Sequence, residues 1–159
     1  MTMANDLTAE QADPSNTIDQ LNSLLRGEIS AAETYRMAID KISENEMANG
    51  GLLREIQAEH GRAAQGIRDR IRELGGEAAD SSGAWGIWAK SVQETMNLFG
   101  DASSLKSLKE GEEHGLKDYK QALPQLDSSS AQLVSNQYIP AQQRHINLLD
   151  QLINSVGKA

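Results

Sequence analysis

Residues 24–39 read LLRGEISAAETYRMAI, and residues 108–123 read LKEGEEHGLKDYKQAL. In both stretches a Gly-Glu pair is followed, seven residues after the glutamate, by a tyrosine and a basic residue. An alanine and an aliphatic residue then close each copy. The glutamates are Glu28 and Glu112, and the tyrosines are Tyr35 and Tyr119. A pattern that returns in this way predicts a duplicated structural unit whose two copies present equivalent side chains.

Each copy lies in a segment with helical periodicity. Apolar residues recur at intervals of three and four, which indicates an amphipathic helix, and both glutamates fall on the apolar face. About 30 residues after each glutamate the sequence reads Gln-x-x-His, first as Gln57 and His60 and then as Gln142 and His145. Residues three apart lie side by side on a helix, so each pair is expected to share one face.

Capping and turn signals divide the chain into four long helices. Capping boxes at residues 17–20 and 129–132 predict the starts of the first and last helices, and Asp101 is expected to cap the third. Gly-rich turns at residues 49–51 and 75–76 are expected to end the first and second helices. The predicted helices run from Thr17 to near Met47, 52–74, 101–126 and 129–156. Pro140 is expected to kink the last of them.

The segment between the second and third helices is predicted to be a long crossover. Residues 75–83 are rich in glycine, alanine and serine and indicate a loop. A short amphipathic helix is expected to follow, with Trp85, Trp88 and Phe99 on one side, either packed on the bundle or facing another subunit. The fold class is therefore all-α, with two helical hairpins joined by one crossover that contains a short extra helix.

Composition excludes several classes of function. The chain has 159 residues, which favours one domain, and we expect a disordered tail at 1–16 and a bundle at 17–159. Its formal net charge of -8 argues against nucleic acid as a partner. It contains no cysteine, so thiolate ligands are excluded. No signal peptide and no apolar run of membrane-spanning length is evident, so we expect a cytoplasmic protein that does not bind a membrane. A dimer or a small ring is the homo-oligomer that the sequence leaves open.

The repeated polar residues predict a metal site. In di-iron carboxylate bundles, two helices each supply a Glu and the other two each supply Glu-x-x-His. The corresponding residues of this chain are Glu28, Gln57, His60, Glu112, Gln142 and His145. Glutamine occupies two positions where this pattern has a carboxylate. The two remaining glutamates carry a charge of -2, whereas two divalent ions carry +4. One divalent ion bound by two Glu and two His would be neutral, and this ligand set suits zinc, iron(II) or manganese.

On these residues the chain resembles the ferritin-like superfamily. Within it the chain is similar to a bacterial family of small four-helix bundles of unknown function, related to rubrerythrin. The resemblance covers residues 17–153, and its stretches are 21–42, 60–76, the crossover, 111–123 and 137–145. It implies a ferritin-like four-helix bundle and a link to iron, oxygen or peroxide handling under stress, without an established activity for the family itself.

Three hypotheses follow from the sequence. The first is a degenerate metal site that binds one or two divalent ions. The second is a metal-free bundle whose inward polar residues bond one another, and which acts by partner binding or self-association. The third is a di-iron oxidase or peroxidase. Glu33, Glu59 and Glu113 are expected to point away from the site, and Tyr35 and Tyr119 to bond the opposite helix through their hydroxyls.

Overall fold

A computed structural model describes residues 13–41, 47–83 and 101–156. Within these ranges the chain is entirely helical apart from turns and the loop at 76–82. The long helices are α1 (Pro14–Lys41), α2 (Met47–Glu73), α4 (Asp101–Ala122) and α6 (Ile139–Val156). Between α4 and α6 lie the 3₁₀ turn η3 (Leu123–Gln125), the short helix α5 (Ser128–Leu133) and the π-helical turn η4 (Val134–Tyr138). The prediction of an all-α chain is confirmed.

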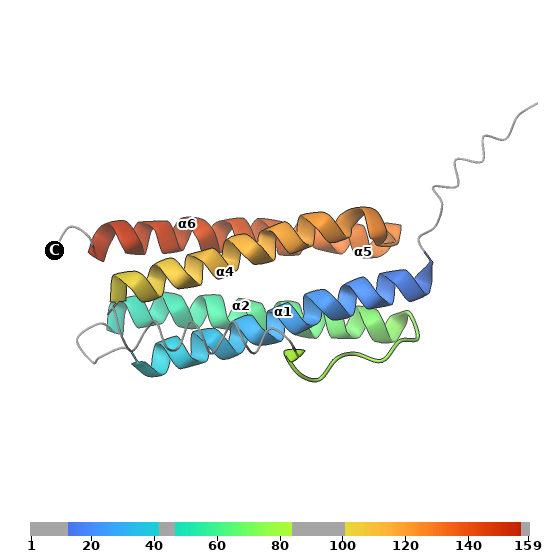
Figure 1. Ribbon diagram of the computed structural model, residues 1–159, viewed down its shortest axis with the longest axis horizontal. Helices are drawn as coiled ribbons and strands as arrows, with labels where there is room; N and C mark the ends of the chain where they lie inside the picture. Colours follow the sequence, from blue (N-terminus) through green and yellow to red (C-terminus); the bar gives the residue numbers. More distant parts are fainter. Residues whose placement is uncertain (1–12, 42–46, 84–100, 157–159) are drawn as a thin grey trace, which may run out of the picture.

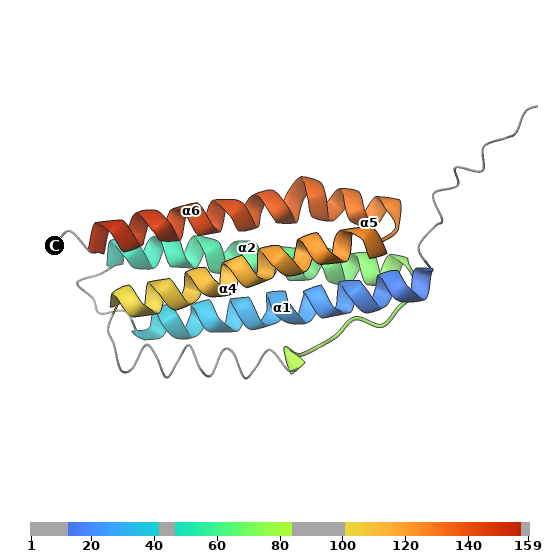
Figure 2. The same cartoon turned by 45° about the horizontal axis from the view of Figure 1, so that its top comes forward.

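The long helices form a bundle of two hairpins, in which α1 packs along α2 and α4 packs along α6 (Figures 1 and 2). The end of α2 and the start of α4 lie at opposite ends of the bundle (Figure 1), as the predicted long crossover requires. The predicted short helix with Trp85, Trp88 and Phe99 lies at 84–100, outside the described residues. None of the described helices combines the length and the apolar character that a membrane crossing requires.

The first helix begins three residues earlier than the predicted capping box. The side chain of Asp13 accepts a hydrogen bond from Ser15 N at 3.0 Å, and Pro14 occupies the first helical position, where its missing N–H costs nothing. Residues 14–16 are therefore helical, although they were assigned to the tail. Thr17 lies inside α1 and is fully buried. Its Oγ1 accepts from the N of Asp127 at 3.0 Å, so it joins two helices instead of capping one.

The turn between α1 and α2 also differs from the prediction. Residues 49–51, expected to form the turn, are helical because α2 already begins at Met47. Helix propensity is a weak constraint that tertiary packing overrides, and two glycines in the first turns of a long helix cost only about 1 kcal/mol each. The predicted stop at the other end of α2 is confirmed. Gly75 has a φ of 81° and Gly76 N donates to Ile71 O at 2.9 Å, which is a Schellman cap.

The last helical segment starts at a different cap and contains an irregular turn. Asp127 caps α5 by accepting from Ser130 N at 2.8 Å, so the predicted box at 129–132 is wrong by two residues. The distortion predicted at Pro140 is present as η4, which ends just before the proline. Because a π-turn adds a residue, Val134 becomes the fully buried residue in place of Leu133, which is half-buried.

The apolar core is divided into two clusters by a polar layer. One cluster contains Leu21, Leu24, Leu25, Ala64, Ile67, Ile71, Tyr119, Ala122, Leu126, Val134 and Tyr138. The other contains Tyr35, Ala38, Leu53, Ile56, Leu105, Leu108 and Leu149. On every long helix one buried ionisable residue lies between the members of the two clusters, namely Glu28, His60, Glu112 and His145. The fold thus places four ionisable side chains at one level of the bundle.

We expect Asp127→Ala to lower the free energy of unfolding by about 1–2 kcal/mol, because it removes the cap of α5. The same side chain pairs with Arg70 at 3.0 Å, which adds to the loss. Arg70 also pairs with Glu73, whose side chain is 65% exposed, so Glu73→Ala serves as the control with an effect below about 0.5 kcal/mol. Urea denaturation of the two variants measures both effects, and equal losses would contradict this role of Asp127.

Candidate metal centre

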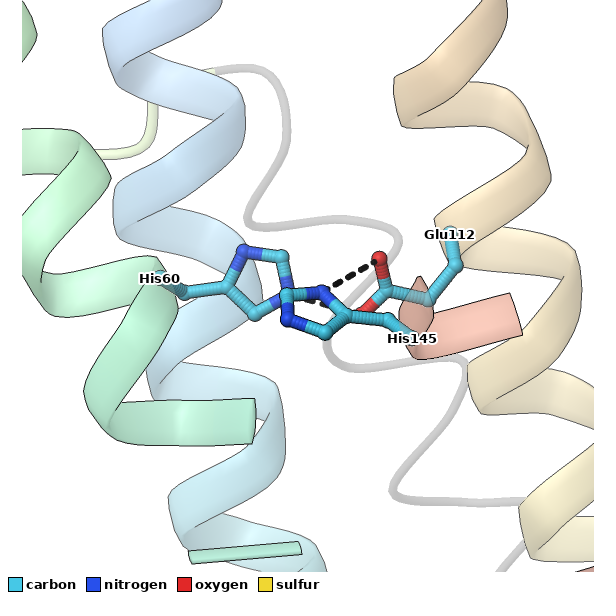
Figure 3. A group of neighbouring side chains, drawn as sticks. All are labelled: His60, Glu112 and His145. Atoms are coloured by element: carbon cyan, nitrogen blue, oxygen red, sulfur yellow. Dashed lines mark hydrogen bonds and ion pairs between the residues drawn. The ribbon is translucent and has the colours of Figure 1, made fainter. Parts of the chain in front are cut away.

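The polar layer takes one residue from each long helix. Glu28 on α1 is 5% exposed, and His60 on α2, Glu112 on α4 and His145 on α6 are each 2% exposed. Figure 3 shows His60, Glu112 and His145 converging between their helices. The repeat and the two Gln-x-x-His motifs therefore bring together four of the six residues predicted to face inward.

His60 is held between two carboxylates. Its Nδ1 lies 2.6 Å from Glu28 Oε2, and its Nε2 lies 2.6 Å from Glu112 Oε1. Since an ionised carboxylate can only accept, both ring nitrogens carry protons in this arrangement and the ring is an imidazolium. Burial alone would lower the pKa of His60, but the charges of Glu112 and Glu28 outweigh it and raise the pKa well above 6.5.

Glu112 is the shared partner of both histidines. Burial would raise its pKa, but the charge of His60, the nearby His145 ring and the hydrogen bond from His60 prevail and lower it to about 2. His145 Nδ1 lies 3.4 Å from Glu112 Oε2. Glu112 is therefore an anion at every ordinary pH, although it is almost fully buried.

The two tyrosines of the repeat bond in a crossed pattern. Tyr35 donates to Glu112 Oε1 at 2.6 Å, and Tyr119 donates to Glu28 Oε1. Each tyrosine thus reaches the glutamate of the other copy, which confirms the predicted bonds to the opposite helix. Burial first, and then the neighbouring carboxylates, raise the pKa of both tyrosines well above 10, so their hydroxyls remain protonated donors.

The two glutamines each donate a hydrogen bond to a main-chain oxygen. Gln142 is buried, and its Nε2 donates to the main-chain oxygen of Glu112 at 3.0 Å. Gln57 is half-buried, and its Nε2 makes a long bond of 3.4 Å to the main-chain oxygen of Ala32. Both amides therefore join the two helices of their own hairpin through Nε2. Gly115 leaves the space, because a Cβ there would lie 2.6 Å from Gln142 Nε2.

Glu59 belongs to the cluster, contrary to the prediction that it points away. Its Oε2 lies 2.5 Å from His145 Nε2, and its Oε1 accepts from Arg144. A glutamate on the flank of α2 can reach α6 because three rotatable bonds carry the carboxylate beyond the face of its Cβ. The sequence contains one indication of this contact. A charged residue precedes each histidine of the site, and the two charges are opposite, because Glu59 precedes His60 and Arg144 precedes His145. Glu33 and Glu113 do lie outside the cluster, as predicted, with exposed side chains.

Two buried polar atoms of the described residues have no hydrogen-bond partner, and they face each other. They are Glu112 Oε2 and His145 Nδ1, 3.4 Å apart. Ligand atoms about 2.1 Å from a tetrahedral ion lie about 3.4 Å from one another. His60, Glu112 and His145 each offer one ligand atom, and these three atoms lie within 4.8 Å of one another, so the three residues can converge on one ion with a small closing movement. Two imidazole nitrogens and one carboxylate fit a divalent transition ion.

Cavities flank the polar layer on two sides. Between α2 and α6 lies one of about 360 Å³, reached by Glu59, His60, Arg62, Tyr138, Arg144 and His145. Between α1 and α4 lies one of about 40 Å³, lined in part by Gly27 and Gly111 of the repeat. The helices α2 and α6 make few contacts with each other. The side of the layer that carries the two histidines therefore has far more open space.

Residues 16–125 match the sequence profile of a family described as a domain of unknown function (DUF2383), and the chain belongs to this family. The matched range includes Glu28, Glu59, His60 and Glu112, and His145 lies beyond it. No curated protein and no solved structure matches the chain.

Proposed function

We propose that this DUF2383 protein is a metal-binding four-helix bundle of the ferritin-like kind, and that it holds one divalent transition ion at His60, Glu112 and His145. The observation that carries the proposal is the pair of partnerless atoms, Glu112 Oε2 and His145 Nδ1. A buried polar atom without a hydrogen-bond partner costs free energy, and an ion bound between two such atoms that face each other at ligand spacing would offset that cost.

The charges favour one ion over two. Of the three carboxylates in the cluster, Glu28 is engaged by His60 and Tyr119, and Glu59 is engaged by His145 and Arg144. Only Glu112 has an oxygen without a partner. A second ion would bring another +2 with no bridging carboxylate to balance it, and uncompensated buried charge costs several kcal/mol. A di-iron oxidase is therefore the weakest of the three hypotheses.

Binding of the ion requires His60 to lose a proton and to give up its hydrogen bond to Glu112. His60 Nε2, which donates to Glu112 Oε1, would have to lose its proton to become a ligand, so metal uptake releases a proton. Glu28 would keep its bond to the other nitrogen of the ring. A bound divalent ion would supply Lewis acidity to a water or small ligand in the cavity between α2 and α6.

A metal-free bundle is the second candidate. The observation in its favour is that the contacts of His60 with Glu28 and Glu112 are complete without an ion. In that case the polar layer would fix the register of the four helices, and function would lie in binding a partner or in self-association. This alternative does not explain why Glu112 Oε2 and His145 Nδ1 lack hydrogen-bond partners.

Metal analysis separates the two candidates. We expect protein purified without chelator, then loaded with Zn²⁺ or Co²⁺, to retain about one equivalent of metal after gel filtration. His145→Ala should reduce this below about a tenth of an equivalent, because it removes a ligand. His114→Ala is the matched control, since this histidine lies on the outer side of α4. If the wild-type protein retains less than a tenth of an equivalent of Zn²⁺, Co²⁺, Fe²⁺ and Mn²⁺ alike, the metal proposal is wrong.

A further inference from the structure

We propose that Glu59 is a positioning residue that selects Nδ1 of His145 as the metal-binding nitrogen. The inference rests on the proposed metal site, because it concerns how one of its ligands is oriented. Glu59 reaches His145 from α2, and Arg144, the neighbour of His145 on α6, holds the second oxygen of the same carboxylate. Glu59 does not point at the place of the ion and is therefore distinct from the three ligands.

The hydrogen bond to Glu59 fixes which nitrogen carries the proton. Glu59 Oε2 lies 2.5 Å from His145 Nε2, and a carboxylate accepts but does not donate. The proton of a neutral imidazole is therefore on Nε2, and the lone pair is on Nδ1. That nitrogen is the atom without a partner, 3.4 Å from Glu112 Oε2. In the other tautomer the Nδ1 proton would point at Glu112, and the lone pair would lie on Nε2, where it faces Glu59 and not the ion.

Arg144 keeps Glu59 in place and ionised. The Glu59 side chain is 18% exposed and lies on the wall of the cavity between α2 and α6, where water competes for its hydrogen bonds. Arg144 and His145 are adjacent residues that bind the two oxygens of this carboxylate. Burial would raise the pKa of Glu59, but the hydrogen bonds from His145 and Arg144 lower it. The anion therefore persists next to solvent.

The other half of the bundle has an equivalent arrangement. His60 donates through Nδ1 to Glu28 Oε2 at 2.6 Å and faces Glu112 with Nε2. Each histidine thus has its own carboxylate on one nitrogen and directs the other nitrogen toward Glu112. Such outer carboxylates orient metal-binding histidines, and their loss reduces metal affinity about 10- to 100-fold. Glu28 and Glu59 occupy this outer position from α1 and α2.

The tautomer of His145 can be measured by ¹⁵N NMR of the imidazole side chains in the metal-free protein at pH 8.5. In the wild type we expect the proton on Nε2. Glu59→Ala should move it to Nδ1, where Glu112 can accept it, and Glu59→Gln should leave it on Nε2, because the amide oxygen of glutamine also accepts. Glu55→Gln, at an exposed position on α2, is the control that should change nothing.

Metal affinity is the second measurement, by competition of Co²⁺ with a chelating indicator. We expect Glu59→Ala to weaken binding about 10- to 100-fold, Glu59→Gln to recover part of the loss, and Glu55→Gln to match the wild type. A wild-type ring with its proton on Nδ1 or on both nitrogens overturns the proposal, as does an unchanged tautomer in Glu59→Ala. If the tautomer moves as expected but the wild type binds no Co²⁺, Glu59 positions His145 and the metal proposal alone is wrong.

Discussion

His60→Leu is expected to destabilise the metal-free protein by about 3–5 kcal/mol, because it leaves two buried carboxylates without a counter-charge. Glu28 and Glu112 are 5% and 2% exposed, and His60 bonds both at 2.6 Å. Removal of the ring also deletes both hydrogen bonds at once. Urea denaturation with chelator present measures the loss, and for a domain of this size we expect a lowered midpoint with an unchanged slope.

Replacement of His60 together with its two carboxylate partners should have a different result. We define the apolar-layer variant as Glu28→Leu, Tyr35→Phe, His60→Leu, Glu112→Leu and Tyr119→Phe, which removes the charges together with the hydroxyls that bond them. Well-packed apolar residues in place of a buried ion network are often neutral or stabilising by about 1–4 kcal/mol. This variant should therefore be at least as stable as the wild type and should bind no metal. A loss below about 1 kcal/mol in His60→Leu would show that His60 is not the bridging cation.

The architecture could be predicted because it depends on periodic signals. Apolar residues at intervals of three and four continue over five or more turns of each helix, and one buried ionisable residue interrupts them on each helix. Glu28 and Glu112 could be placed opposite each other because the repeat itself relates them. The crossed bonds of Tyr35 and Tyr119 follow from the same symmetry, since a tyrosine two turns from its own glutamate is too far away to bond it.

The details that were mispredicted depend on single side chains or short segments. Glu59 was placed outside the site from the direction of its Cβ, whereas the carboxylate lies several bonds further out and reaches His145. Gln57 and Gln142 occupy the expected faces, yet their amides bond main-chain oxygens. Helix propensity and capping patterns define the ends of helices only weakly, which explains the displaced caps near Thr17 and at residues 129–132.

The stability of the metal-free protein should depend on pH at both ends of the scale because of this layer. The pKa of Glu112 is lowered from 4.5 to about 2, so its contribution is complete above pH 4.5 and is lost as the pH falls toward 2. The pKa of His60 is raised above 6.5, so its contribution is complete below pH 6.5 and is lost as the pH rises through the value in the folded protein. The layer stabilises most between these limits.

We therefore expect the difference in free energy of unfolding between the wild type and the apolar-layer variant to favour the wild type most at pH 5–6. It should decrease toward pH 3, where Glu112 begins to bind a proton only after unfolding, and again toward pH 9, where unfolding lets His60 lose its proton. Use of the difference cancels the contributions of groups that both proteins share, such as Asp127 and Glu59. Denaturation with urea at pH 3, 5.5 and 9, with chelator throughout, measures it.

The acidic and alkaline parts of this pH dependence test different residues of the layer. If the difference in free energy of unfolding stays constant from pH 5.5 to 9, His60 is neutral in the folded protein. In that case Glu28 and Glu112 share a proton that does not belong to His60. A constant difference from pH 5.5 to 3 would mean that Glu112 is not held as an anion. Zn²⁺ added at pH 9 should restore stability to the wild type only, because the ion replaces the His60 proton as the buried cation. Such a rescue would show that one position in the layer accepts either a proton or a metal ion. The electrostatics of the layer and its proposed function would then depend on the same residues.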